Sequence, residues 1–170
     1  MNDTKGADPS AGRPLSPGED TGRKRPLRLL FPGSFDPFTK GHRSIVVRAL
    51  SFADEVVVAI GANADKRGAF PPEERKARIE RLFADNPRVK VDIYYGLTTD
   101  YARQVGAHAI LRGARYVRDF EYERSLADIN RALTGIETII LMAEPQYASI
   151  SSSVVRELMA YGQDVSPFLP

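Results

Sequence analysis

A segment near the start of the chain combines the residue types that hold phosphate groups. It reads Phe31-Pro32-Gly33-Ser34-Phe35-Asp36-Pro37-Phe38-Thr39-Lys40-Gly41-His42. Gly33 lets the backbone approach a ligand closely, and Ser34 offers a hydroxyl beside free amides. Thr39 is a good helix N-cap, so His42 is expected in the first turn of a helix, where backbone amides and the helix dipole attract phosphate. An imidazolium there would neutralise charge that develops on a pentacovalent phosphorus, without acting as a nucleophile.

The two histidines of the chain call for different interpretations. A histidine that stands alone is more often a surface residue than a catalytic one, and we interpret His108 in this way because it lies in Gly-Ala-His-Ala before an expected strand. For His42 the alternative is a generic strand-to-helix turn with a surface histidine. The glycines, aspartate and proline of the segment before it argue against that alternative.

A second segment of this kind lies near the end of the chain. It reads Ile150-Ser151-Ser152-Ser153-Val154-Val155-Arg156. Taken alone it is weak evidence, because serine is a common N-cap. Tyr147, just before it, could stack against a nucleobase or pack in the core.

The elements that must position these segments follow from the hydrophobic pattern. Short β-branched runs predict strands at 27–31, 56–60, 89–95, 109–111 and 138–142, and amphipathic stretches predict helices at 41–50, 72–85, 99–105, 120–133 and 151–161. This alternation predicts an α/β fold with a doubly wound, mostly parallel five-stranded sheet. Ligands of such sheets bind at the carboxyl ends of the strands, so the loops after residues 31, 60, 111 and 142 are expected around one crevice.

Composition limits the class of protein. The 170 residues carry a formal net charge of +2 and no cysteine. Residues 1–28 hold six Lys/Arg and four Asp/Glu, so the remainder is balanced, which argues against a nucleic-acid partner. No apolar run is long enough to cross a membrane, no secretory signal is present, and the lack of cysteine favours the cytoplasm. Residues 1–26 are polar and rich in proline and glycine, so we expect a disordered extension before one domain at 27–170.

The two segments together resemble the signature of the nucleotidyltransferase superfamily, which combines a (His/Thr)-x-Gly-His motif with a C-terminal Ile-Ser-Ser-(Ser/Thr)-x-x-Arg motif. Within it the chain is similar to the phosphopantetheine adenylyltransferase family. Three features carry that similarity: Thr39 at the first motif position, the block Arg112-Gly113-Ala114-Arg115 with Asp119-Phe120-Glu121-Tyr122-Glu123 and Asn130, and Lys66 leading into Phe70 and Glu73-Glu74-Arg75. For the residues 119–123 alone, a solvated helical face is an equally good interpretation.

The resemblance implies a Rossmann-like nucleotidyltransferase fold in which His42 is the catalytic residue. ATP is expected to contact Ser34, Phe35, His42, Gly113, Ala114, Arg115, Glu123, Tyr147, Ala148, Ser149, Ile150, Ser151, Ser152 and Ser153. The acceptor is expected to contact Ser34, Lys66, Thr98 and Arg112. Lys66 and Arg112 suit this role chemically, because two cations at the ends of neighbouring strands can hold a dianionic phosphate. Thr98 and Thr99 stand where the family usually has aliphatic or methionine side chains.

By the same resemblance, the expected reaction transfers AMP from ATP to 4′-phosphopantetheine, giving dephospho-coenzyme A and pyrophosphate. Mg²⁺ is expected to be held mainly through ATP phosphates, because no carboxylate cluster resembles a metal cage. Family members are typically hexamers, so a homo-oligomer is expected. The alternatives are a related enzyme with another phosphorylated acceptor, such as nicotinamide mononucleotide, and a non-catalytic nucleotide-binding regulator on the same fold.

Overall fold

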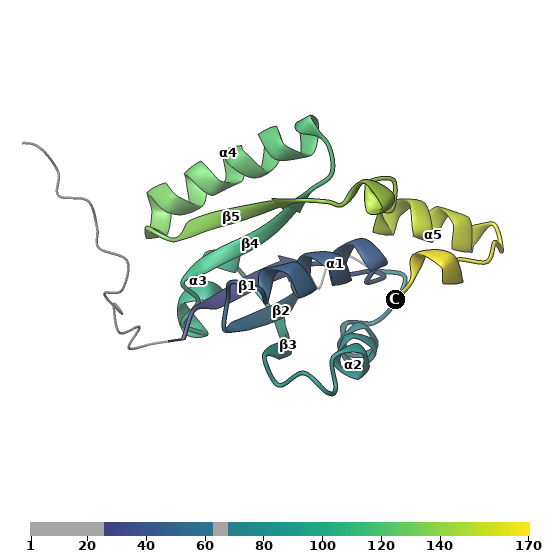
Figure 1. Ribbon diagram of the computed structural model, residues 1–170, viewed down its shortest axis with the longest axis horizontal. Coiled ribbons are helices and arrows are strands. Elements are labelled where there is room, and N and C mark those ends of the chain that lie inside the picture. Colours follow the sequence, from purple (N-terminus) through teal and green to yellow (C-terminus); the bar gives the residue numbers. More distant parts are fainter. Residues whose placement is uncertain (1–25, 63–67) are drawn as a thin grey trace, which may run out of the picture.

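Strands and helices alternate along the chain, as the hydrophobic pattern predicts. The computed structural model describes residues 26–62 and 68–170. The elements within them are β1 (Arg28–Gly33), α1 (Lys40–Ala49), β2 (Glu55–Gly61), α2 (Pro72–Leu82), β3 (Val89–Tyr94), α3 (Thr98–Gln104), β4 (Ala109–Ala114), α4 (Val117–Thr134), β5 (Glu137–Met142) and α5 (Ser152–Ala160), with 3₁₀ turns at Pro145–Tyr147 and Ser166–Phe168 (Figure 1). Of the predicted extension, residues 1–25 lie outside the described residues.

The five strands form one parallel sheet in the order β3-β2-β1-β4-β5. The chain first moves outward from β1 through β2 to β3 and then returns to the other side of β1 for β4. This reversal is the switch point at which α/β sheets bind ligands. The predicted doubly wound α/β architecture is therefore confirmed, and its crevice is expected at the carboxyl ends of β1 and β4.

Helices cover both faces of the sheet. On one face, Ile45 and Val46 of α1 and Ile79 of α2 pack into the larger core cluster. On the other face, Tyr101 and Ala102 of α3 belong to a separate cluster with Leu30, Val57 and Ile110. Helix α4 covers this second face too, because its residues Leu126 and Ala127 share a cavity with Ile110. Burial on both sides explains why residues 56–60 of β2 form a continuous apolar run.

Strand β4 is longer than the sequence predicts, and the difference bears on the site. The expected strand ended at Leu111, with Arg112 and Gly113 in the following loop. Instead, Arg112, Gly113 and Ala114 stay in the strand and lie opposite Ile140, Leu141 and Met142 of β5. Continuous pairing with β5 outweighs the low strand preference of glycine. The side chain of Arg112 is thus fixed by a sheet rather than carried on a loop.

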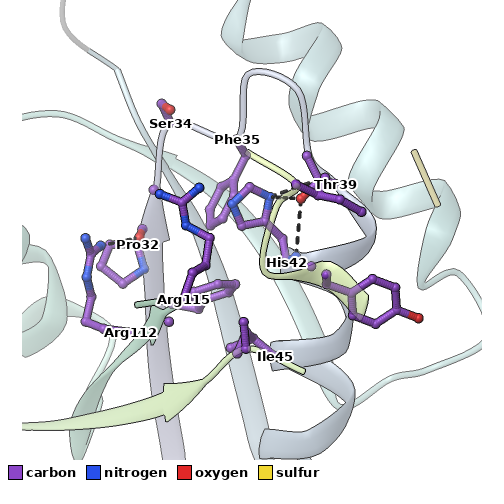
Figure 2. A pocket seen from close by; sticks show the side chains of 15 residues that line it. Pro32, Ser34, Phe35, Thr39, His42, Ile45, Arg112 and Arg115 are labelled. Atoms are coloured by element: carbon purple, nitrogen blue, oxygen red, sulfur yellow. Dashed lines mark hydrogen bonds between the residues drawn. The ribbon is translucent and has the colours of Figure 1, made fainter. Parts of the chain in front are cut away.

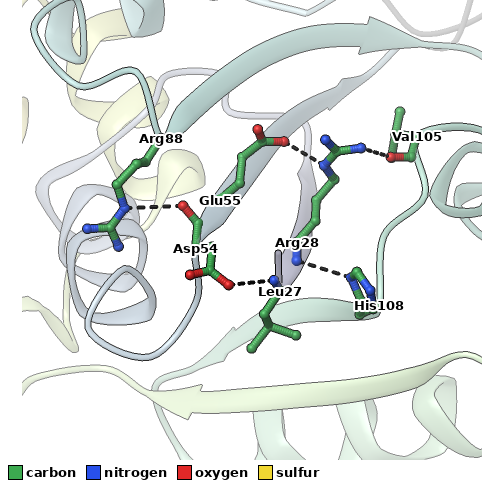
Figure 3. A network of polar contacts seen from close by, with 7 residues as sticks. All are labelled: Leu27, Arg28, Asp54, Glu55, Arg88, Val105 and His108. Atoms are coloured by element: carbon green, nitrogen blue, oxygen red, sulfur yellow. Dashed lines mark hydrogen bonds and ion pairs between the residues drawn. The ribbon is translucent and has the colours of Figure 1, made fainter. Parts of the chain in front are cut away.

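The amino ends of the strands are joined by a polar network on the edge of the sheet away from the predicted crevice (Figure 3). Arg28 pairs with Glu55 at 2.6 Å and also donates to the carbonyl of Val105. The backbone N–H of Arg28 donates to Nδ1 of His108 at 3.1 Å. His108 is exposed, as predicted, and its contact belongs to this network. Within the described ranges, no helix combines the length and the apolar character needed to cross a membrane.

Candidate active site

The sheet splits at its switch point. Strand β1 stays paired with β2 as far as Gly33, and β4 stays paired with β5 as far as Ala114, whereas β1 and β4 pair only at Leu29–Ala109 and Leu30–Ile110. Beyond these two pairs the strands diverge, and a cavity of about 270 Å³ opens between their carboxyl ends. Its walls come from β1, the loop after it, α1, β4 and the segment before α5. The structure therefore places the cavity where the sequence predicted the crevice.

His42 lies in this cavity with a defined orientation (Figure 2). Thr39 is the N-cap of α1, and the two residues form a capping box. The backbone N–H of Thr39 donates to Nδ1 of His42 at 3.0 Å, and the Thr39 hydroxyl accepts from the His42 backbone N–H at 3.4 Å. A backbone N–H can only donate, so Nδ1 must be the unprotonated nitrogen. The proton of the neutral ring is therefore on Nε2, which is free to donate to a ligand.

Three phenylalanines surround the imidazole. The ring centroid of His42 lies 5.1 Å from that of Phe35, 5.3 Å from that of Phe38 and 6.3 Å from that of Phe31. This burial, together with the positive charges of Arg115 and Arg112, lowers the pKa of His42 from 6.5 to about 4. The lowered pKa thus disfavours, in the free protein, the imidazolium that the sequence suggested. At neutral pH His42 is an uncharged donor, and the positive charge of the site resides on the arginines.

The loop between β1 and α1 is held by hydrogen bonds to other parts of the chain. The carboxylate of Asp36 accepts from the backbone N–H groups of Ala69 at 2.7 Å and Phe70 at 3.0 Å. Arg75 of α2, 8% exposed, donates to the carbonyl of Ser34. Phe35 takes a left-handed backbone with φ of 47°, a conformation that a bulky residue rarely adopts without such external restraint.

The C-terminal serine motif adds two more contacts to the same loop. Ser152 donates to the carbonyl of Pro37 at 2.9 Å, and Arg156 donates to the carbonyl of Asp36 at 2.6 Å. Ser151 caps α5 through the backbone N–H of Val154, and Ser153 accepts from Arg156. The two motifs, separated by more than a hundred residues, are thus docked on each other. Of the three serines expected to contact ATP, Ser152 thus supports the loop that leads into the helix of His42.

Arg112 spans the split in the sheet. Its Nη1 donates to the carbonyl of Pro32 on β1 at 2.8 Å, while its Nε and Nη2 each donate at 2.7 Å to the carboxylate of Glu123 on α4. A guanidinium has five N–H groups, so two remain for a phosphate. Glu123 is 7% exposed, and both of its oxygens accept from Arg112. The structure therefore places Glu123 as the group that orients Arg112.

The predicted residues other than Thr98 and Glu123 fall into three groups. Those that line the His42 cavity are Ser34, Phe35, Arg112, Gly113, Arg115, Tyr147 and Ile150. An added Cβ at Gly113 would lie 3.3 Å from the side chain of Ile45 of α1, a tight contact that would require Ile45 to shift. Those near the cavity but outside its lining are Ala114, Ala148, Ser149, Ser151, Ser152 and Ser153. Lys66 lies outside the described residues.

The predicted acceptor residue Thr98 lies in a neighbouring cavity on the α3 and α4 side of the sheet. Arg112 and Glu123 line this cavity too, together with Asn130 and Thr138. The hydroxyl of Thr98 is 2.8 Å from that of Tyr94, whose ring stacks on Tyr101. The Arg112–Glu123 pair is thus shared by the lining of two cavities, with His42 on one side and Thr98 on the other.

Sequence reasoning assigned no role to Asp36, Arg75 or Arg156, although all three lie in the quoted motifs. Their side chains bind backbone groups far away in the sequence, which a linear pattern does not reveal. The signal was present in the fixed spacing of the motifs. A match to a motif does not by itself tell whether a residue contacts a ligand or holds the fold.

Comparisons with known proteins agree with this geometry. The Cytidylyltransferase-like family model matches residues 30–158. A phosphopantetheine adenylyltransferase from Phocaeicola vulgatus is 61% identical over 143 residues, covering 84% of this chain and 95% of that protein. One from Leuconostoc citreum is 47% identical over 142 residues, covering 83% and 90%. A crystal structure from Francisella tularensis, a bifunctional NMN adenylyltransferase/ADP ribose pyrophosphatase complexed with AMP and a manganese ion, has a TM-score of 0.66 at 18% identity, covering 85% of this chain and 44% of that one.

The split parallel sheet, the histidine at the start of α1 and the two docked motifs define a nucleotidyltransferase. A sequence identity of 61% that spans most of this chain and of its relative is far above the level at which proteins share only a fold. The chain belongs to the phosphopantetheine adenylyltransferase family.

The lowered pKa of His42 predicts how stability depends on pH. A histidine with a pKa of about 4 in the folded chain and 6.5 as its ordinary value binds a proton more readily after unfolding, so the free energy of unfolding falls as the pH falls from 6.5 toward 4. Between pH 7 and pH 5 we expect His42 to contribute a loss of roughly 1–2 kcal/mol. Urea unfolding at both pH values would measure it.

The matched control for this measurement is His42→Gln. Glutamine at the third helical position can still complete a capping box with Thr39, but it does not titrate. The variant should therefore lose less stability than the wild type over the same pH interval. Equal losses in the two proteins would show that His42 is not held neutral by the fold.

Proposed function

We propose that this protein transfers AMP from ATP to 4′-phosphopantetheine, producing dephospho-coenzyme A and pyrophosphate, a step of coenzyme A biosynthesis. The observation that carries the proposal is the docking of the serine motif on the His42 loop beside Arg112 and Arg115, in a chain 61% identical to a phosphopantetheine adenylyltransferase. This geometry supplies hydrogen-bond donors and positive charge at one cavity. It suits a reaction in which negative charge moves between phosphate oxygens.

ATP is proposed to occupy the His42 cavity, with its phosphates toward the start of α1. The first-turn amides of this ten-residue helix point toward the cavity end, and Arg115 adds a guanidinium that is steadied by Asp119 at 3.0 Å. Tyr147 lies over the start of α1, since an added Cβ at Gly41 would be 3.7 Å from its Cβ. The adenine is proposed to lie near Tyr147 and Ile150, at the C-terminal motif.

The acceptor is proposed to approach from the cavity that contains Thr98. Its phosphate would contact the two free N–H groups of Arg112, together with Ser34 and Lys66. Bound in this way, the acceptor phosphate would lie on the β4 side of the His42 cavity, next to the proposed position of the α-phosphate of ATP. Positioning two substrates in this way accounts for much of the rate enhancement that enzymes of this kind achieve.

The chemistry is a single displacement at phosphorus. An oxygen of the acceptor phosphate forms a bond to the α-phosphorus of ATP, while the bond from the α-phosphorus to the oxygen that bridges to the β-phosphate breaks. The bonding electrons leave with pyrophosphate. The Nε2–H of His42 donates to a non-bridging oxygen of the α-phosphate and stabilises the charge that accumulates there, with no covalent intermediate on the enzyme.

Mg²⁺ is proposed to arrive with ATP and to be held mainly by its phosphate oxygens. Among the described residues no group of three or more His, Asp or Glu side chains could hold a metal ion by itself. The two carboxylates beside the cavity, Asp119 and Glu123, are engaged by Arg115 and Arg112. When bound, Mg²⁺ would neutralise phosphate charge. The protein's own contribution is the arginines and His42.

Removing the imidazole should slow the chemical step without preventing ATP from binding. Because the amides of α1 and Arg115 still contact the phosphates, we expect His42→Ala to bind ATP within a few-fold of the wild type in calorimetry. Its kcat should fall about 10²–10³-fold, the usual effect of losing one such donor. Pyrophosphate release with 4′-phosphopantetheine, and with nicotinamide mononucleotide as the competing acceptor, measures both rate and specificity.

His108→Ala is the control, since it removes the other histidine from the far edge of the sheet and should leave kcat unchanged. His42→Gln keeps the cap and offers the two N–H donors of its side-chain amide in place of the imidazole Nε2–H, so its kcat should fall less than that of His42→Ala. A normal kcat for His42→Ala, or an adenylylated histidine trapped on the enzyme, would overturn the mechanism. Turnover of nicotinamide mononucleotide in preference to 4′-phosphopantetheine would overturn the choice of acceptor.

A separate prediction concerns Lys66 and Arg112, the two cationic residues proposed to bind the phosphate of the acceptor substrate. Lys66→Ala and Arg112→Lys should raise the KM for 4′-phosphopantetheine and lower kcat, while the affinity for ATP changes little. Each loses a charge-assisted contact worth roughly 1.5–3 kcal/mol. Lysine is the better replacement at position 112, because alanine would leave the buried carboxylate of Glu123 without a cation. Equal weakening of ATP and acceptor binding would mean that these cations serve the nucleotide instead.

The protein is proposed to be a cytoplasmic homo-oligomer, and six chains are proposed by family resemblance. Helix α4 exposes Val117, Ile129 and Leu133 at 72%, 54% and 69%, beside the edge strand β5, so it offers an unpartnered apolar surface. Light scattering should give a mass several times 18.8 kDa. The double variant Ile129→Glu/Leu133→Glu should reduce this mass, whereas Arg124→Glu on the same helix serves as the charge control. A monomeric wild type would contradict the proposal.

A further inference from the structure

The end of β3 and the start of α3 are joined by a pair of hydroxyl groups. Oη of Tyr94, the last residue of β3, lies 2.8 Å from Oγ1 of Thr98, the first residue of α3. Thr98 lines the cavity of about 240 Å³ from which the acceptor is proposed to approach. Tyr94 is 8% exposed and does not belong to the described lining of that cavity. The contact therefore joins a residue of the acceptor cavity to a residue behind it.

The side chain of Tyr94 is held on two sides. Its ring stacks on that of Tyr101 of α3, with the centroids 4.8 Å apart and an interplanar angle of 15°. The Tyr101 hydroxyl in turn donates to the carboxylate of Asp92 at 2.5 Å. On β2, Gly61 leaves room for the phenol, because an added Cβ there would lie 3.1 Å from Oη of Tyr94. The Tyr94 hydroxyl is thus held at a defined position beside Thr98.

The chemistry of the two hydroxyls indicates which one donates. Among the described residues, Thr98 is the hydrogen-bond partner of the Tyr94 hydroxyl. A phenol is more acidic than an aliphatic alcohol and is therefore the better donor of the two. With Tyr94 donating to Thr98, the Thr98 hydroxyl keeps its own proton for a further hydrogen bond. That proton can reach a ligand in the cavity that Thr98 lines together with Arg112.

We propose that Tyr94 is a positioning residue for the acceptor, which orients the Thr98 hydroxyl as a hydrogen-bond donor to an oxygen of the acceptor substrate. The inference rests on the proposed function, because it concerns the cavity from which 4′-phosphopantetheine is proposed to approach. Arg112 supplies the positive charge in this cavity, and Thr98 supplies a neutral donor. A hydroxyl already held by Tyr94 loses less freedom when the acceptor binds, so it contributes more to affinity than a freely rotating one.

Steady-state kinetics with ATP and 4′-phosphopantetheine test this role. Tyr94→Phe keeps the stacked ring and removes the hydroxyl, so the KM for 4′-phosphopantetheine should rise about 2–10-fold, the usual effect of losing one neutral hydrogen bond. The KM for ATP and kcat should change little. Thr98→Val should raise the acceptor KM at least as much, whereas Thr98→Ser, which keeps the hydroxyl, should stay near the wild type. The double variant Tyr94→Phe/Thr98→Val should match Thr98→Val alone, because Tyr94 acts through Thr98.

Tyr101→Phe is the matched control, since it removes a hydroxyl from the same ring stack but leaves the contact with Thr98. It should lower the melting temperature and leave the acceptor KM unchanged. An equal rise of that KM in Tyr101→Phe and Tyr94→Phe would show a purely structural role and overturn the inference. An unchanged KM in Tyr94→Phe, or effects that multiply in the double variant, would overturn it and leave the proposed function intact. A wild type that does not turn over 4′-phosphopantetheine would overturn both.

Discussion

The hydrogen bond between the backbone N–H of Thr39 and Nδ1 of His42 is the contact on which the chemistry of the site depends. It satisfies one of the backbone donors that a helix start leaves without a partner, and the same bond decides which nitrogen of the ring carries the proton. The phenylalanines and the two arginines then oppose a second proton. The capping interaction therefore fixes the position and the tautomer of the proposed catalytic side chain, and its surroundings keep it uncharged.

In this arrangement the arginines supply positive charge, and His42 supplies a hydrogen-bond donor in a fixed direction. The positive charge beside the cavity comes from Arg112 and Arg115, each of which pairs with a carboxylate on α4. His42 contributes a directed donor with no charge of its own. A neutral donor keeps its geometry whatever the charge of the nucleotide, whereas an imidazolium would lose the bond from Thr39. The split between β1 and β4 brings the two contributions together, because Arg112 crosses it and His42 begins the helix beside it.

The sequence was sufficient for the architecture and for the family. Strong apolar periodicity and the two spaced motifs predicted the alternation of elements, the parallel sheet and the crevice at its switch point. It was insufficient wherever a property depends on three-dimensional neighbours. The charge of His42 is set by rings and guanidiniums that the fold brings around it. Likewise, Arg112 belongs to a strand because β5 pairs with it, and Glu123 is buried because Arg112 reaches it. Propensity along a single chain contains none of this information.

Three side chains hold the loop between β1 and α1 by hydrogen bonds to its backbone carbonyls. Arg75, Arg156 and Ser152 all donate to backbone carbonyls, those of Ser34, Asp36 and Pro37, and none of the three contacts depends on the side chain at the position that accepts. Mutational drift at Ser34 would consequently change what the loop offers to a substrate while leaving its path, and the place of His42 behind it, intact. What the loop offers to a substrate and how the loop is held are therefore set by different atoms, side chains for the first and backbone carbonyls for the second.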